Sequence, residues 1–281
     1  MITVKEALQR ASFQLREAGI TAPRREAEIL LAAILEKSRA WLYAHADEIL
    51  GNAAYLQFRQ WVKRRAEGEP YAYLCGEREF MGLPFLVTPA VLIPRPETEI
   101  LVEAVAEELR ECPNPKLLEI GAGSGAIAVT LATLLPQAEI VAVDISTAAL
   151  EVAALNAERL RVGKRLRLLP GDLYAPVRGQ KFTAVISNPP YIPTKDLTNL
   201  TKDVKDYEPQ VALDGGPDGL AFYRRLTVEL KELAAAPRFL ALEVGQGQAA
   251  SVSALCHHAG YQKIKKIPDL AGIPRVILAK L

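Results

Sequence analysis

A glycine-rich turn between a short strand and a helix constrains the fold of this chain more than any other feature. Residues 116–120 (KLLEI) form a short apolar run, which predicts a buried strand. The sequence GAGSG follows at 121–125, and a helical apolar pattern covers 126–135. The glycines permit positive φ and let a ligand approach the backbone, while the helix start offers free N–H groups. The turn therefore predicts a parallel α/β sheet with a ligand site at one edge.

Further strands alternate with helices along the rest of this half of the chain. A glycine or a polar residue stands near the end of each of the first four strands. Because open α/β sheets bind ligands at the carboxyl ends of their strands, we expect these residues to gather at one edge. The expected strands are 116–120 before Gly121, 139–143 before Asp144, 166–169 before Gly171 and Asp172, 182–186 before Asn188, and then 239–244, 261–267 and 275–279.

The fourth strand runs into the sequence Asn-Pro-Pro-Tyr at 188–191. Proline has a fixed φ and no N–H, so the backbone must leave the sheet here as a stiff, extended segment. Its carbonyls are free to accept hydrogen bonds, and the Asn188 amide can both accept and donate. Asn-Pro-Pro alone would be read as a plain turn, but after a glycine-rich turn it favours a site that grips a planar NH₂ group.

Two classes of cofactor fit the glycine-rich turn. The spacing Gly121-x-Gly123-x-x-Ala126 also matches the dinucleotide fingerprint, so the turn alone leaves a nicotinamide cofactor and S-adenosylmethionine open. Asp144 is placed to hold both hydroxyls of a ribose, and Asp172 to meet an adenine amino group. No Tyr-Lys or His pair for hydride transfer follows the fourth strand. The Asn-Pro-Pro-Tyr segment at 188–191 would act as a clamp that grips an NH₂ group. Such a clamp beside an adenosine cofactor favours methyl transfer to nitrogen.

The sequence divides into three regions. Residues 1–70 are expected to be a helical substrate-docking domain, 71–97 a linker with a β-hairpin that turns at Gly82, and 98–281 the catalytic domain. Thr98 is expected to cap the first helix of the catalytic domain. Within the first region, helical spacing of apolar residues predicts helices that start near Thr3, Pro23 and Ala53.

Composition excludes several classes of function. The net charge is +1, from 34 basic and 33 acidic residues, which is unlike a protein that holds nucleic acid by bulk electrostatics. Cys75, Cys112 and Cys256 are far apart, and His257 and His258 have no partner cluster, so no metal site is expected. No stretch approaches the roughly 20 apolar residues of a membrane span, and no signal core is present. We expect a monomeric cytoplasmic protein with no membrane or direct nucleic-acid contact.

The motifs together resemble a known enzyme family. IGAGSGAIA at 120–128, Asp144 and the Asn-Pro-Pro-Tyr sequence are similar to the N-methylating branch of the class I S-adenosylmethionine-dependent methyltransferases. With the helical N-terminal region, nearly the whole chain resembles the PrmC (HemK) family of peptide chain release factor N5-glutamine methyltransferases. The segments that narrow the resemblance to this family are VLIPRPETE at 91–99, YEP at 207–209, ALDGGPDGL at 212–220, and DLAG at 269–272 with Arg275.

The resemblance implies a fold, a reaction and a set of site residues. The fold would be a Rossmann-like, mostly parallel seven-stranded sheet, and the reaction would methylate the Gly-Gly-Gln glutamine of class I release factors in support of translation termination. S-adenosylmethionine would be the methyl donor and S-adenosylhomocysteine the product. The residues that bind the substrate amide and carry out the catalysis would be Asn188, Pro189, Pro190 and Tyr191. The residues that bind the cofactor would be Gly121, Ala122, Gly123, Ser124, Gly125, Asp144, Asp172, Leu173 and Asn188. Family members more often carry an aromatic residue at the position of Leu173.

Other functions remain open at this point. The ribosomal-protein glutamine methyltransferases share the Asn-Pro-Pro-Tyr sequence, although they usually depart from Pro-Arg-Pro-Glu-Thr after the arginine. An adenine-N6 nucleic-acid methyltransferase would use the same clamp on a flipped base. A non-enzymatic release-factor-binding protein could keep the fold alone. Arg95 could anchor the linker, or it could contact the methionine carboxylate of the cofactor or the substrate.

Overall fold

The computed structural model describes residues 1–281 and separates into two compact units. The first unit comprises Met1–Glu77 together with Thr201–Tyr207, and the second comprises Arg78–Leu200 together with Glu208–Leu281. The short helix α9 (Lys202–Lys205) therefore belongs to the first unit, although it lies far along the chain. No helix of the structure combines the length and the apolar character that a membrane span needs.

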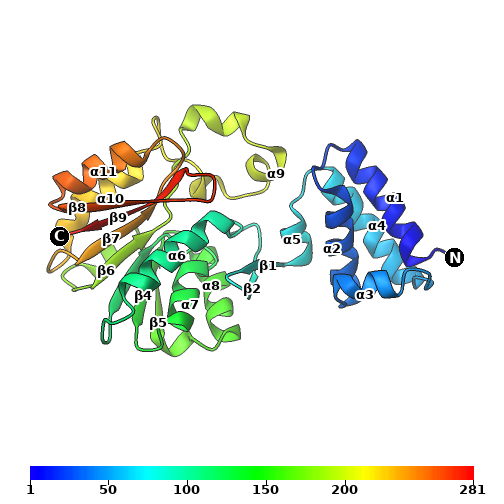
Figure 1. The fold of residues 1–281 in the computed structure, drawn as a ribbon, viewed down its shortest axis with the longest axis horizontal. Helices are drawn as coiled ribbons and strands as arrows, with labels where there is room; N and C mark the ends of the chain where they lie inside the picture. The colour runs from blue at the N-terminus through cyan, green and yellow to red at the C-terminus, as the bar shows by residue number, and fades with distance from the viewer. The chain divides into compact units, whose positions relative to one another are not determined.

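The first unit is a helical bundle (blue to cyan in Figure 1). A capping box starts its first helix, because Thr3 Oγ1 accepts from the Glu6 N–H and the Glu6 carboxylate accepts from the Thr3 N–H. Leucines and alanines of the first two helices form the centre of its core with Phe58 and Val62. The helices are α1 (Val4–Glu17), α2 (Pro23–Leu35), α3 (Arg39–Ala44), α4 (Asn52–Ala66) and α5 (Tyr71–Cys75).

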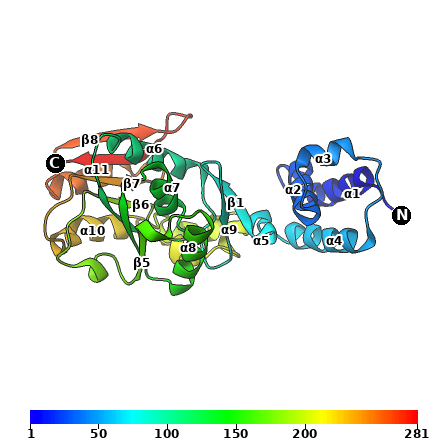
Figure 2. The ribbon, with the colours of Figure 1, turned by 90° about the horizontal axis from the view of Figure 1, so that it is seen from below.

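The second unit is built on a seven-stranded sheet with the order β5-β4-β3-β6-β7-β9-β8. The first five strands in this order are parallel, and β9 is antiparallel to both of its neighbours. Figure 2 shows β8 and β9 together at one side of the sheet. The strands are β3 (Lys116–Ile120), β4 (Glu139–Asp144), β5 (Leu166–Pro170), β6 (Ala184–Ser187), β7 (Phe239–Glu243), β8 (Lys263–Pro268) and β9 (Pro274–Lys280). The expected Rossmann-like, mostly parallel seven-stranded sheet is confirmed.

Helices cover both faces of this sheet (Figure 1). The buried side chains between helices and sheet form two separate cores. One core lies under α6 (Pro96–Glu108), α7 (Ala126–Leu134) and α8 (Thr147–Arg159), and the other under α10 (Ala221–Val228) and α11 (Ala249–His258). Strands that are buried on both faces read as continuous apolar runs, which is why the sequence exposes them so clearly. A two-stranded sheet of β1 (Glu77–Phe80) and β2 (Leu83–Leu86) forms the expected hairpin around Gly82.

The register of the central strands brings distant segments to the same edge. Ile120 pairs with Val143 on one side and with Ser187 on the other. The residues that follow these three positions are Gly121, Asp144 and Asn188. Ser187 pairs in turn with Leu242, so Glu243 continues the same row. Four segments of the chain therefore meet where the strands end.

Helix α6 begins earlier than the sequence predicts. Arg95 is its N-cap and Pro96 its first residue, so Thr98 lies inside the first turn. Proline suits the first helical position, because its missing N–H has no partner to find there. The expectation that Thr98 is the cap is therefore wrong. The shift leaves the Thr98 hydroxyl available for a contact outside the helix.

Candidate functional site

A cavity of about 250 Å³ lies at the carboxyl ends of β3, β4 and β6, within the second unit. Ten of the residues predicted to form the site lie along its wall. Gly125 and Tyr191 do not, since Gly125 packs against Ala153 and Tyr191 packs against the neighbouring apolar core. The ten are Gly121, Ala122, Gly123, Ser124, Asp144, Asp172, Leu173, Asn188, Pro189 and Pro190.

Asp144 fixes the glycine-rich turn. Its Oδ2 accepts from the Gly123 N–H at 2.8 Å, and its Oδ1 accepts from the Ser146 N–H at 2.9 Å. Gly121 and Gly123 have φ of 83° and 53°, which a residue with a side chain adopts only at a cost. Each carboxylate oxygen keeps a free lone pair, since an ionised carboxylate has about four acceptor positions. Asp144 can therefore hold the turn and still accept hydrogen bonds from two hydroxyls of a ligand.

Glu119 presents an unsatisfied carboxyl group at the wall of the cavity. The side chain is 1% exposed, its Oε2 accepts from the Ala128 N–H at 3.1 Å, and its Oε1 has no hydrogen-bond partner. Burial raises the pKa of Glu119 well above its usual value, although the Ala128 N–H opposes this shift. Buried polar atoms of native proteins normally find partners, so this oxygen is placed to receive a donor or a cation from a ligand.

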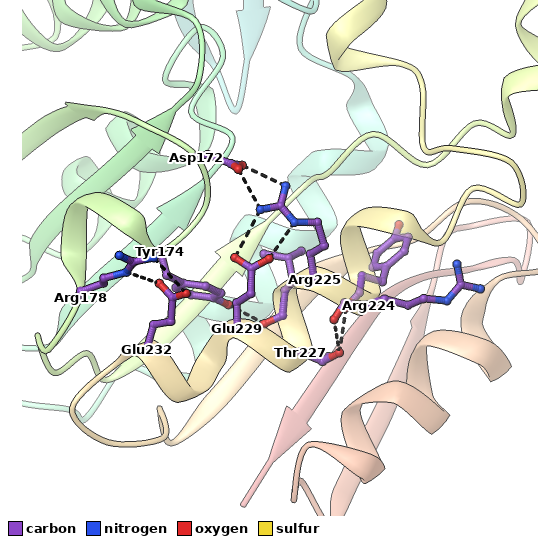
Figure 3. A network of polar contacts seen from close by, with 10 residues as sticks. Asp172, Tyr174, Arg178, Arg224, Arg225, Thr227, Glu229 and Glu232 are labelled. Carbon is purple, nitrogen blue, oxygen red and sulfur yellow. Dashed lines mark hydrogen bonds and ion pairs between the residues drawn. The ribbon is translucent and has the colours of Figure 1, made fainter.

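Asp172 is held by an arginine from the helix opposite. Arg225 Nη1 and Nη2 donate to the two carboxylate oxygens of Asp172 at 3.1 and 2.8 Å, and Arg225 Nε donates to Glu229 at 2.7 Å (Figure 3). Arg225 also lines the cavity. Leu173 follows at a positive φ of 46°, which is strained for leucine. The pair fixes the direction in which the Asp172 carboxylate faces the cavity.

The Asn-Pro-Pro-Tyr segment leaves the sheet directly beside the glycine-rich turn. A Cβ on Gly121 would lie 4.0 Å from the carbonyl oxygen of Asn188. The Asn188 Nδ2 donates to Thr98 Oγ1 at 3.1 Å. Burial raises the pKa of the Tyr191 hydroxyl to about 12, so it stays protonated at neutral pH.

A glycine-rich loop packs against the backbone of this segment. The Gly215 N–H donates to the Ile192 carbonyl at 2.8 Å. Gln248 Nε2 donates to the carbonyls of Tyr191 and Gly219 at 2.9 and 3.2 Å. A Cβ on Gly219 would lie 2.3 Å from the Tyr191 oxygen. The loop therefore fixes the position of the segment that carries Asn188.

Arg95 has a partner within the second unit. Its Nη2 donates to Glu208 Oε1 at 2.5 Å, and Glu208 Oε2 accepts from the Ile93 N–H at 3.2 Å. Glu208 is 5% exposed, so the pair ties the segment before α6 to the Tyr-Glu-Pro sequence at 207–209. This contact supports the role of Arg95 as an anchor, although Arg95 also reaches the wall of the cavity.

Sequence reasoning missed three polar residues that support the site. Asn156 is fully buried, and its Nδ2 donates to the carbonyls of Ser124 and Leu86 at 2.9 and 3.0 Å. Thr98 and Glu243 lie beside Asn188, and they are 4% and 2% exposed. A buried Asn in the helical pattern of 147–159 could have drawn attention to Asn156, whereas no local pattern shows which residue Thr98 or Glu243 faces. No group of three or more His, Cys, Asp or Glu side chains is placed to hold a metal ion.

Comparisons with known proteins place the chain among methyltransferases. A family model described as "PrmC N-terminal domain" matches residues 6–76, and one described as "Methyltransferase small domain" matches residues 96–204. The release factor glutamine methyltransferase of Moorella thermoacetica is 47% identical over 279 residues, which cover 99% of this chain and 98% of the relative. The enzyme of the same name from Geobacter sulfurreducens is 43% identical, over 98% of this chain and 95% of the relative.

Solved structures share the fold at low sequence identity. The catalytic domain of hMettl16, in complex with a hairpin of the MAT2A 3'UTR, aligns with a TM-score of 0.57 at 14% identity and covers 82% of this chain and 81% of that one. A methyltransferase from Pyrococcus furiosus aligns with a TM-score of 0.51 at 18% identity, over 79% of this chain and 97% of that one. At such identities the likeness supports the fold alone.

Proposed function

The chain belongs to the release factor glutamine methyltransferase family, and from this premise we propose how its cavity performs the reaction. It is an S-adenosylmethionine-dependent protein methyltransferase. Its substrate is the side-chain amide of the glutamine in the Gly-Gly-Gln motif of class I peptide chain release factors. The observation that carries the assignment of the site is the strand register, which sets Gly121 between Asp144 on one side and Asn188 on the other.

The residues around the cavity fit the cofactor. Asp144 can accept from the two ribose hydroxyls, and Asp172 can accept from the adenine amino group. The glycine-rich turn leaves room for the methionine end, where the unpaired Glu119 oxygen suits a cationic neighbour. Leu173 offers an apolar side chain to the adenine in place of an aromatic ring. The bound cofactor supplies an electrophilic methyl group.

The protein's task is to position a poor nucleophile. The nitrogen of a glutamine amide is unreactive, because its lone pair is delocalised into the carbonyl. Asn188 Oδ1 and the Pro189 carbonyl would accept the two N–H hydrogens, while Pro190 and Tyr191 keep the segment rigid. This grip fixes the amide plane, increases electron density on nitrogen and leaves one face open for in-line attack. Such positioning alone can supply a large part of a rate enhancement.

The proton balance requires no strong base. The cofactor, held at the glycine-rich turn and Asp144, would supply the methyl group to the amide nitrogen and would keep the electron pair of the broken carbon–sulfur bond on its sulfur. The alkylated nitrogen is then strongly acidic and loses its hydrogen to the acceptor that already holds it and onward to water. Tyr191 is protonated at neutral pH, so it cannot serve as a base there.

The first prediction tests the reaction itself. When the protein is incubated with S-adenosylmethionine and an unmethylated class I release factor, we expect one added methyl group per molecule. Fragmentation by mass spectrometry should place it on the glutamine of the Gly-Gly-Gln motif. A release factor with that glutamine replaced by alanine is the control and should remain unmodified.

Other acceptors would contradict the assignment. Methyl transfer to a ribosomal protein, and not to the release factor, would place the chain with the ribosomal-protein enzymes. Transfer to adenine in DNA or RNA would make it a nucleic-acid methyltransferase. We propose that the enzyme acts as a monomer in the cytoplasm, where release factors work, without direct contact to nucleic acid.

A second prediction concerns the adenine end of the cavity. We expect Arg225→Ala to weaken S-adenosylhomocysteine binding by about two- to fivefold, the range for losing a half-exposed ion pair. The reason is that Asp172 would lose the guanidinium that fixes its direction. Isothermal titration of the purified variant measures the change.

The neighbouring arginine provides a matched control. Arg224 pairs with Asp218 and does not line the cavity. Arg224→Ala removes the same type of side chain from the same helix and should leave cofactor affinity unchanged. Equal affinities for the two variants would contradict the role assigned to Arg225.

A further inference from the structure

The side-chain amide of Asn188 can present either its oxygen or its nitrogen to the cavity. An Asn side chain carries an acceptor oxygen on one side and a donor NH₂ group on the other, and only the surrounding hydrogen bonds decide between them. The clamp works only if Oδ1 faces the substrate, because a substrate NH₂ group needs acceptors. Something in the protein must therefore hold Asn188 in that orientation.

Thr98 and Glu243 surround the other side of Asn188. Asn188 Nδ2 donates to Thr98 Oγ1 at 3.1 Å, and the Glu243 carboxyl lies near enough to both side chains that their polar hydrogens lower its pKa. Glu243 ends β7 and follows Leu242, the partner of Ser187, so it reaches Asn188 from the adjacent strand. Thr98 comes from the first turn of α6. Two separate elements, α6 and β7, thus converge on the amide group of Asn188.

The chemistry of these groups fixes the direction of each hydrogen bond. An ionised carboxylate can only accept, so Thr98 must donate its single hydroxyl hydrogen to Glu243. Thr98 Oγ1 can then only accept from Asn188, which must present Nδ2 on this side. We propose that Thr98 and Glu243 are positioning residues that hold Asn188 Oδ1 toward the cavity and thereby select a substrate that offers an NH₂ group. The proposal deepens the function proposed above and rests on it.

A purely structural role explains Glu243 poorly. Its side chain is 2% exposed, and its Oε2 has no hydrogen-bond partner. An apolar residue would cost less at such a position, since a buried carboxyl loses its hydration without full compensation. The feature that an apolar residue could not reproduce is a group that, when ionised, can accept from Thr98 and Asn188 and cannot donate.

The same logic makes the clamp sensitive to protonation. Burial raises the pKa of Glu243 to about 7, against the hydrogen bonds from Thr98 and Asn188. A protonated Glu243 can donate to Thr98, whose hydroxyl then favours the opposite orientation of the Asn188 amide. Clamp function should therefore be lost as the pH falls below about 7. The charged or titratable groups that act on Glu243 are Glu97 from α6, Arg275 from β9, Tyr191 from the segment after β6 and Tyr223 from α10.

Removal of the Thr98 hydroxyl is the direct test. We expect Thr98→Val to lower kcat by roughly 10- to 100-fold, the range seen when an outer partner of an active group is removed. The KM for the release factor and the affinity for S-adenosylhomocysteine should change little, because the orientation of one amide affects the reacting geometry. Thr98→Ser restores the hydroxyl and should recover most of the rate. Thr227→Val is the matched control, since the buried Thr227 hydroxyl donates to helix carbonyls away from the site.

Glu243→Gln provides an independent test and covers the case in which Thr98→Val does not fold. Glutamine can donate as well as accept, so the rate should be low and should lack the loss of kcat below about pH 7 that the wild type shows. Folding of each variant is checked by its binding of S-adenosylhomocysteine.

The outcomes separate this inference from the proposed function. If the wild type methylates the release factor while Thr98→Val and Glu243→Gln keep its kcat and its pH profile, the positioning role is wrong and the function stands. If the wild type does not methylate the release factor at any pH, both fail.

Discussion

Replacing Asn188 with alanine is expected to lower kcat by about 10²- to 10³-fold, the loss seen when one pre-aligned hydrogen-bonding group is removed from an active site. The variant would keep the Pro189 carbonyl but would lose the acceptor for the second N–H of the substrate amide. That amide could then rotate away from the in-line geometry. Single-turnover rates with saturating release factor measure the effect without interference from product release.

Cofactor binding should survive this substitution. Asn188 lines the cavity, but the contacts expected to hold the ribose and the adenine come from Asp144 and Asp172. We expect the affinity for S-adenosylhomocysteine to change by less than about fivefold, because a single uncharged hydrogen bond contributes about 1 kcal/mol. A near-wild-type single-turnover rate for Asn188→Ala would remove the clamp from the mechanism.

A second asparagine provides the control. Asn114 is exposed before the start of β3, at the opposite edge of the sheet. Its φ is 47°, so Asn114→Ala costs some stability but touches no part of the cavity. A loss of rate in both variants would indicate a general effect on the fold.

The sequence predicted the sheet and its binding edge because both depend on local patterns. β3, β4, β6 and β7 are buried on both faces, so each is a continuous apolar run that local reasoning can recognise. A parallel arrangement then brings Gly121, Asp144 and Asn188 to the same edge without further information. The observed register agrees with that expectation, because Ile120 pairs with Val143 on one side and with Ser187 on the other.

The partners of Asn188 could not be predicted in the same way. Thr98 is 90 residues from Asn188 along the chain, and the pattern around it favours a helix cap. Glu243 stands at the end of an apolar strand, where a single carboxylate gives no sign of the residue that it faces. Side-chain contacts of this kind depend on the exact start of α6 and on the pairing of β6 with β7. Local propensity determines neither of these.

We expect the second large effect from a substitution in the glycine-rich loop, which contains Gly215 and Gly219 and packs against the Asn-Pro-Pro-Tyr segment. We expect Gly219→Ala to destabilise the protein by about 2–4 kcal/mol, from a left-handed backbone and an overpacked contact together. Gly219 has a φ of 75°, and an added Cβ would lie 2.3 Å from the Tyr191 oxygen and 2.6 Å from Gln248 Nε2. Because the first of these atoms is backbone, the clash can be relieved only if the chain at Tyr191 moves.

Movement of Tyr191 should reach the clamp. Tyr191 is three residues from Asn188, and the two prolines between them transmit a displacement because they cannot absorb it by rotation about φ. A shift of about 1 Å at a reacting group can cost on the order of 100-fold in rate, so we expect kcat to fall by at least about tenfold. Thermal unfolding and single-turnover kinetics on the same preparation measure the two effects.

The Gly179→Ala variant is a control that distinguishes the effect of the steric clash from that of backbone strain. Its φ is 69°, close to that of Gly219, but nothing lies within 4 Å of an added Cβ. Gly179→Ala should therefore cost only the left-handed conformation, about 1 kcal/mol, and leave kcat unchanged. If the two alanine variants unfold at the same temperature and turn over at the same rate, the loop does not fix the Asn-Pro-Pro-Tyr segment. If Gly219→Ala alone loses rate at a temperature where it is fully folded, the position of the clamp depends on the contact between this loop and Tyr191.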